Sequence, residues 1–326
     1  MGIIDSLSAG YRLLIQRLEL LLLPLLLDAF IWFAPRLSIE PLLQRFASFY
    51  VGIFDQLGEA AVTAGPGLAD LPAQVTTALD AAGKSLNLFD LLVSSSLYHV
   101  PSLLVILPDL KTSQATLELV SLFNVSSSGL VLGLLGLLLG VTYMNLLARI
   151  VPLGEGEKSV TPPLFFSAVL RHWLRSLGFL LVLLLFLLML YIPVGVGVTV
   201  LMLISPALGL GAMMLVSGLL TVIFFYLYFV TVGLVLDNLG VRAAVMRSIV
   251  LVRNNFWSTL GFFLLTNLIS VGITLLLQEV ATMGLAGLVG SALVNAFVGT
   301  GLAVALLIFY RTRLIVTAEK IQGQKS

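Results

Sequence analysis

The stretch RSIVLVRNNFWSTLGFFLLT, residues 247–266, decides the fold because a basic segment runs directly into an apolar one. The same order occurs as AVLRHWLRSLGFLLVLLLF at 168–186 and as AGYRLLIQRLELLLLPLLL at 9–27. Leu-rich runs without period-2 alternation indicate membrane-crossing helices, since a helix pairs its own backbone groups. The pattern predicts a cytoplasmic interfacial helix followed by a two-helix hairpin, three times over; chance likeness among Leu-rich segments is an equally good explanation.

The composition is that of an integral membrane protein. Of 326 residues, 59% are hydrophobic and only 10% are charged, whereas about a quarter are charged in soluble domains. The net charge of +1 gives no indication of a nucleic-acid partner. The chain has no Cys and two His, so the sequence predicts no disulfide, no Cys- or His-rich metal site and no cofactor.

We expect an all-α polytopic bundle of about six transmembrane helices. The expected spans are 18–34, 129–149, 177–201, 208–236, 257–278 and 284–310. Residues 37–128 interrupt the first hairpin and predict an extracytoplasmic helical insertion. The chain then divides into 1–36 (interfacial helix and first span), 37–128 (insertion) and 129–326 (remaining spans with two interfacial segments).

Orientation follows from the basic residues, because cytoplasmic loops are enriched in Lys and Arg. One set of flanks holds 13 of the 17 basic residues, and the other holds only Arg36, Arg45, Lys84 and Lys111. This division predicts a multi-pass protein of the cell membrane with both termini in the cytoplasm.

The sequence predicts three short helices in the insertion. The first begins at Pro41, and the others cover 71–82 and 85–96. Their apolar faces either pack on each other and on the outer ends of the bundle, or form a docking surface for lipid or another protein.

The basic interfacial segments predict contacts with lipid headgroups, because Arg and Trp suit that depth. The expected contact residues are Arg12, Arg17, Arg171, Arg175, Arg247, Arg253, Trp173 and Trp257.

Four polar residues fall inside expected spans: Asp28, Asn145, Asn267 and Asn295. Amides there usually form interhelical hydrogen bonds. Asp28 lies near the middle of the first span, where a charge is costly, so we expect it to be buried and mainly protonated. Pro24 is expected to kink this helix and admit a neighbour such as Asn145 or Asn295. Asp28 is then either a structural hydrogen-bonding group or a proton- or substrate-coupled site.

Two similar sets of residues carry a resemblance to a group of known proteins. They are Ala244, Arg247, Ser248, Asn255, Phe256, Trp257 and Leu260-Gly261, and the similar Ala168, Arg171 and Leu177-Gly178. They resemble bacterial six-helix proteins related to the membrane domain fused to some glycerophosphodiester phosphodiesterases. The resemblance implies a bacterial six-helix membrane domain and supplies no catalytic positions. It covers most of the chain except 37–128, and the chain contains no soluble phosphodiesterase domain.

No nucleophile with a neighbouring base, and no converging set of metal ligands, is evident in the sequence. The leading interpretation is therefore a non-enzymatic accessory or scaffold protein that contacts membrane lipids and partner proteins. The alternative is a transporter of a small solute, ion or lipid with Asp28 in the polar path. An intramembrane enzyme is a third and more distant reading.

Overall fold

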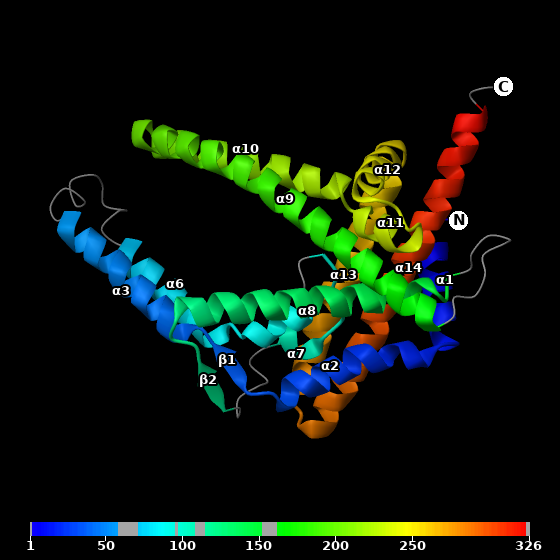
Figure 1. Cartoon of the computed structure of the whole chain (residues 1–326), viewed down its shortest axis with the longest axis horizontal. Coiled ribbons are helices and arrows are strands. Elements are labelled where there is room, and N and C mark those ends of the chain that lie inside the picture. Colours follow the sequence, from blue (N-terminus) through cyan, green and yellow to red (C-terminus); the bar gives the residue numbers. More distant parts are fainter. Residues whose placement is uncertain (1, 58–70, 95–96, 108–114, 152–161, 324–326) are drawn as a thin grey trace.

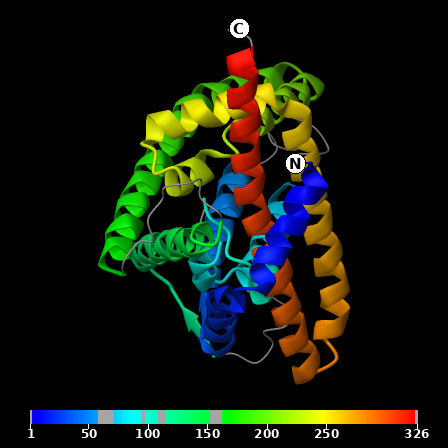
Figure 2. The ribbon, with the colours of Figure 1, turned by 90° about the vertical axis from the view of Figure 1, so that its right-hand side faces the viewer.

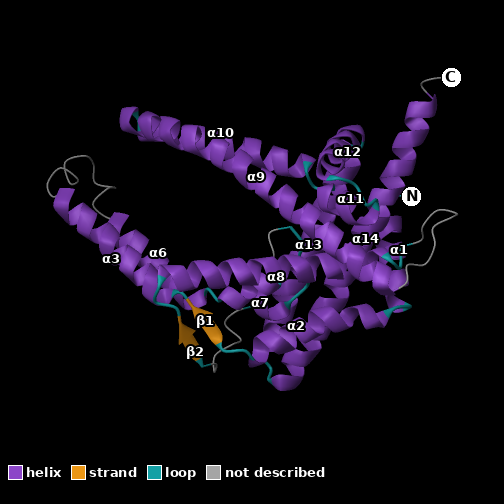
Figure 3. Ribbon diagram, viewed as in Figure 1, coloured by secondary structure: helices purple, strands orange, loops and turns teal. Residues whose placement is uncertain are grey.

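The computed structural model describes residues 2–57, 71–94, 97–107, 115–151 and 162–323, and these parts are almost entirely helical (Figure 3). In chain order the elements are α1 (Ile3–Ile15), the 3-10 helix η1 (Leu18–Leu21), α2 (Leu22–Phe33), β1 (Arg36–Ser38), α3 (Glu40–Leu57), α6 (Leu71–Ser85), the 3-10 helix η2 (Leu88–Leu92), α7 (Leu103–Ile106), β2 (Thr116–Glu118), α8 (Leu122–Ala148), α9 (Pro162–Ile204), α10 (Pro206–Tyr226), α11 (Val230–Leu236), α12 (Val241–Asn254), α13 (Phe256–Ala281) and α14 (Leu285–Gly323).

The expected all-α membrane fold is confirmed. Five helical segments in the described parts of the chain are long and apolar enough to cross a bilayer: Leu122–Ala148, Leu164–Met202, Ala207–Leu236, Phe256–Ala281 and Leu285–Thr317. They correspond to the second to sixth expected spans.

The expected first span, 18–34, differs. Its first turn is the 3-10 helix η1, and α2 has only 12 residues, or roughly 18 Å at 1.5 Å per residue, against the 30 Å or so of a hydrocarbon core. Pro24 lies in the first turn of α2, where no intrahelical donor is lost. Pro24 therefore marks a helix start, and the expected kink within a longer helix is absent.

The apolar helices splay apart. In Figures 1 and 2, α13 and α14 form an upright hairpin, and α8 crosses it at a steep angle. The long hairpin of α9 and α10 extends away from both (Figure 1). Within the most apolar part of α9, only 6% of residues are buried, whereas half are buried in α14. The core is therefore concentrated around α14, α8 and α11.

The three sequence copies take three different geometries. α1 packs along α14, with the Tyr11 hydroxyl donating to the Val298 carbonyl at 3.2 Å, so its apolar face covers protein near the middle of a span. The second expected interfacial segment is continuous with its span as the 43-residue α9. The third copy, α12, is a separate helix that ends at Asn254, directly before α13 begins at Phe256.

The insertion contains two of its expected helices, α3 and α6, which pack on each other as an arm. The third, expected over 85–96, is only the short η2, and residues 95–96 lie outside the described residues. β1 and β2 form an unexpected parallel two-stranded sheet that joins the two ends of the insertion, with Leu37 opposite Leu117. The η2 backbone lies against Gly136 of α8, so part of the insertion packs within the helical core.

Candidate functional site

Asp28 is buried and joins α2 to the start of α7. Its carboxylate accepts a hydrogen bond from the Ser102 hydroxyl and from the backbone N–H groups of Leu103 (3.2 Å) and Leu104 (3.4 Å). Ser102 is also the N-cap residue of α7. Both carboxyl oxygens take part in these hydrogen bonds, and the expected protonated state of Asp28 stays a prediction. Asp28 thus bonds to the start of α7. Of the neighbours expected for it, Asn145 bonds to Val141 and His172, and Asn295 lines a cavity.

Asn145 holds His172, which the sequence places in an interfacial helix. The Asn145 amide donates to the Val141 carbonyl at 2.8 Å, which directs its oxygen to His172 Nδ1 at 2.9 Å. The other ring nitrogen lies 3.2 Å from the Asn238 side-chain oxygen. His172 is buried, so it joins α8, α9 and the loop after α11 and does not contact headgroups.

Two arginines predicted to contact headgroups are held by that same loop. Arg175 donates to the Asn238 backbone and side-chain oxygens, each at 2.6 Å. Arg247 forms an ion pair with Asp237 at 2.7 Å, and Asp237 also accepts from the Tyr310 hydroxyl at 2.6 Å. Both arginines therefore have partners within the protein, and their contact with lipid headgroups stays a prediction.

The other predicted contact residues are mostly exposed. Trp257 is 79% exposed at the start of α13. Trp173 is half-buried, and its indole N–H donates to the Leu134 carbonyl at 3.2 Å. Arg12, Arg17, Arg171 and Arg253 are exposed, with Arg17 also paired to Glu19 at 3.3 Å.

Asn267, expected between helices, is exposed on α13 and donates to its own Phe263 carbonyl at 2.8 Å. This amide is satisfied within one helix, and the expectation of an interhelical bond is wrong for it.

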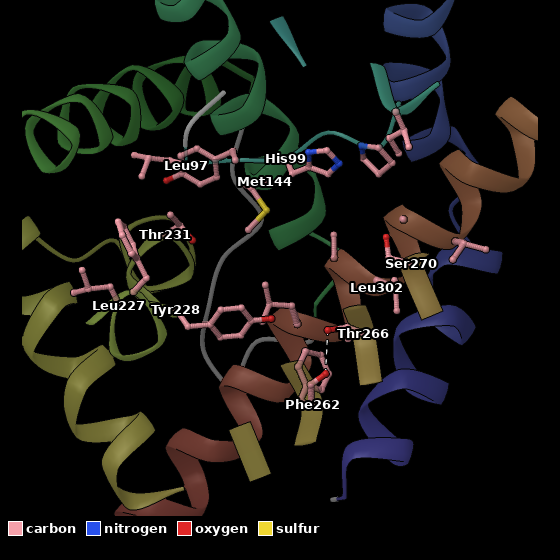
Figure 4. A pocket seen from close by; sticks show the side chains of 18 of the residues that line it. Leu97, His99, Met144, Leu227, Tyr228, Thr231, Phe262, Thr266, Ser270 and Leu302 are labelled. Carbon is pink, nitrogen blue, oxygen red and sulfur yellow. Dashed lines mark hydrogen bonds between the residues drawn. The ribbon is translucent and has the colours of Figure 1, made fainter. Parts of the chain in front are cut away.

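A cavity of about 420 Å³ lies where α9, α11, α13 and α14 converge (Figure 4). This volume is within the range of about 300–1,000 Å³ that small-molecule sites occupy. Tyr98, Met144 and Phe262 form buried parts of its wall. The loop before α7 closes one side, and the Tyr98 hydroxyl in this loop lies 2.7 Å from the Ser176 hydroxyl of α9.

The mouth of the cavity is marked by its exposed lining residues. Phe224 and Ser270 are exposed, and they belong to two different candidate spans, Ala207–Leu236 and Phe256–Ala281. His99 is also exposed at this rim. An opening between two spans lets an apolar molecule enter sideways from the hydrocarbon.

Asn295 brings an unsatisfied donor to the cavity wall. Its residue is 7% exposed, and its Nδ2 has no hydrogen-bond partner among the described residues. Leaving such a group unpaired costs about 1–3 kcal/mol. The Tyr228 hydroxyl, in the turn between α10 and α11, interacts with Thr266 of α13, whose own hydroxyl donates to the Phe262 carbonyl at 2.9 Å.

The lining has no Asp, Glu, Lys or Arg in the described part of the chain. The one titratable base at the rim is His99, and desolvation by its surroundings lowers the pKa of His99. The described residues also contain no cluster of three or more potential metal ligands. The arrangement suits binding of an uncharged, largely apolar molecule and offers hydrogen bonds at a few points.

Sequence reasoning singled out Asn295 and missed the other polar groups of the cavity. Tyr98 and His99 lie in a loop that the sequence places outside the membrane, and nothing in that loop indicates that it folds back under α9. Thr266 and Ser270 carry a weak signal, because with Phe262 they repeat every four residues along one face of α13.

Comparison of the chain with protein-family models, with curated proteins and with solved structures found no match.

Proposed function

We propose that this protein is a non-enzymatic accessory protein of the cell membrane that takes up one lipid-like molecule from the bilayer into its cavity. The observation that carries the proposal is the mouth between the Phe224 and Ser270 helices, which leads into an apolar cavity of about 420 Å³. Because the lipid chain moves from hydrocarbon and not from water, van der Waals packing and hydrogen bonds within the cavity, and not the hydrophobic effect, must hold it there. The proposal keeps the lipid contacts expected from the sequence and places them at a defined site.

We further propose that both termini face the cytoplasm, supported by the 13 to 4 division of basic residues. Five candidate spans alone would leave the two termini on opposite sides, so this proposal requires η1 and α2 together to complete a sixth crossing. The resemblance to the six-helix bacterial membrane domain of phosphodiesterases remains part of this proposal. Partner membrane proteins also remain a prediction, for which the exposed α9–α10 hairpin offers area.

The alternative, a transporter that uses Asp28, has one observation in its favour. Asp28 lines a second cavity of about 360 Å³, bounded by Trp32, Leu104 and residues of α14. Its carboxylate oxygens, however, already accept three hydrogen bonds from Ser102 and the start of α7. A proton- or substrate-coupled role would require those bonds to break.

The test is photolabelling in liposomes with a single-chain lipid analogue that carries a diazirine on its chain. Ala303→Phe fills the cavity, and Ala286→Phe on the same helix is the matched control because Ala286 is exposed. We expect labelled peptides to contain Met144 or Phe262, with labelling reduced several-fold in Ala303→Phe only. Equal labelling of these peptides in the wild type and both variants would overturn the proposal.

A further inference from the structure

Asn295 gives the cavity a chemical preference that its volume alone does not. The side chain comes from α14 and lines the same cavity as Thr266 of α13, and its buried Nδ2 is a donor with no acceptor among the described residues. Asn267, an amide one helix away, illustrates the contrast, because it donates to its own helix. An N–H group on an apolar wall attracts an oxygen acceptor from whatever occupies the cavity.

The acceptor must be uncharged. No described lining residue carries a full charge that could pair with a phosphate, a carboxylate or an ammonium group. Transfer of an unpaired ion into such surroundings is strongly unfavourable, whereas the smaller cost of burying an ester or amide carbonyl is offset by a hydrogen bond to a protein donor. The nearby hydroxyls of Tyr228 and Thr266 can serve the same kind of neutral group.

We propose that the cavity selects a neutral acyl ester or amide, whose carbonyl oxygen accepts a hydrogen bond from Asn295 Nδ2 and whose chain fills the apolar remainder. This inference rests on the proposed function, because it presumes that a lipid-like molecule enters. It concerns recognition only, and no bond of the ligand is broken.

The experiment is competition against the photoactivatable analogue in nanodiscs, with three competitors that share one saturated chain. They are a methyl ester, the corresponding carboxylate at a pH well above its pKa, and an alkane. In the wild type we expect the ester to compete about five- to tenfold better than the other two, the ratio that one neutral hydrogen bond supplies. Equal competition by ester and alkane would overturn the assignment of Asn295, and preference for the carboxylate would overturn the neutral ligand.

The variant Asn295→Leu keeps the side-chain size and removes the donor. We expect the ester to fall to the level of the alkane in this variant, whereas Asn267→Leu keeps the wild-type ratio. A full ester preference in Asn295→Leu would assign recognition to another group. The wild-type series decides the question even if the variant fails to fold. Failure of the underlying function is distinguishable, since then labelling does not respond to Ala303→Phe or to any competitor.

Discussion

At the scale of single residues, the Asp28 carboxylate is the most connected polar group between α2 and α7. It satisfies the Ser102 hydroxyl and two backbone donors that the start of a helix leaves without intrahelical partners. We therefore expect Asp28 to act on stability, and its substitutions distinguish this role from transport.

Asp28→Ala should destabilise the protein by about 1–3 kcal/mol, because the hydrogen bonds are lost and their donors stay buried without partners. Asp28→Asn should cost less, since the amide oxygen still accepts. The midpoint of unfolding in mild detergent measures both, with Ser102→Ala as the single-bond control. A wild-type midpoint for Asp28→Ala would contradict the structural role, and a folded Asp28→Asn protein that loses function would restore the coupled site.

His99 predicts a pH dependence. Desolvation lowers the pKa of His99 below its ordinary 6.5, so between the lowered value and 6.5 the folded state binds fewer protons than the unfolded state. Stability should then increase with pH through this window and be lost as the pH falls below about 6.5. Unfolding midpoints measured from about pH 7.5 to 5 should fall more for the wild type than for His99→Gln. The dependence of stability on pH should be weak because the ring is exposed. Identical curves for the wild type and His99→Gln would rule out a contribution of His99 to this dependence.

The four polar residues of the expected spans show which features of a single residue the sequence predicts and which it does not. Asp28 binds a helix start, Asn145 binds a histidine, Asn295 faces a cavity, and Asn267 faces outward. The sequence shows that each is polar within an apolar run and costly to leave unpaired. Which face of its helix meets protein depends on the crossing of helices distant in the chain, and this information is absent from local periodicity.

At the scale of elements, glycines report how closely backbones approach. A Cβ on Gly136 of α8 would lie 2.0 Å from the Leu91 carbonyl oxygen of η2, whereas a Cβ on Gly129 of the same helix meets nothing within 4 Å. Gly129 and Gly136 each begin a G-x-x-x-G pattern, with Gly133 and Gly140 as the second glycines, and such patterns favour close helix packing. A Cβ on Gly133 would also meet nothing within 4 Å, so of Gly129, Gly133 and Gly136 only Gly136 lies against a neighbouring backbone, that of η2.

Gly136→Ala and Gly129→Ala therefore form a matched pair. We expect Gly136→Ala to destabilise the protein, since backbone atoms of η2 must move. Gly129→Ala should stabilise it by about 0.4–1 kcal/mol, because alanine reduces the entropy of the unfolded chain and favours the helix. Denaturant titration of both variants, compared with the wild type, measures the two opposite signs. Loss of stability in Gly129→Ala would mean that this face of α8 is covered by protein.

At the scale of the whole molecule, the amino-acid composition predicts the structure better than it does for single residues or elements. The helical membrane class and five of the six spans follow from runs of apolar residues, whose cost of exposure to water leaves few alternatives. The splay of α8, α9 and α13 does not follow, because Leu-rich surfaces pack with many partners at similar energy. The first span was overestimated because residues Leu18–Leu21 form a 3-10 turn and the α-helix begins only at Leu22, a difference in backbone geometry that hydropathy does not record.

Topology can be tested in this Cys-free chain by introducing single cysteines. Ser85→Cys at the end of α6 should be labelled by an impermeant thiol reagent from outside intact cells. Met246→Cys, on an exposed position of α12, should be labelled only after permeabilisation. Ser159, in the predicted cytoplasmic loop before α9, would be another position for a cysteine, but it lies outside the described residues. The reverse labelling pattern would invert the proposed orientation of the protein.

The arm of α3 and α6 begins and ends at one place. Gly83 lies against Glu40, and the Arg36 guanidinium donates to the Gly83 and Leu86 carbonyls beside it. A segment whose two ends touch can be exchanged for another with the same spacing without pulling the flanking chain apart. The base of the arm is thus a natural graft point, where a rigid guest domain could replace residues 41–82 and leave α8, α14 and the cavity in place.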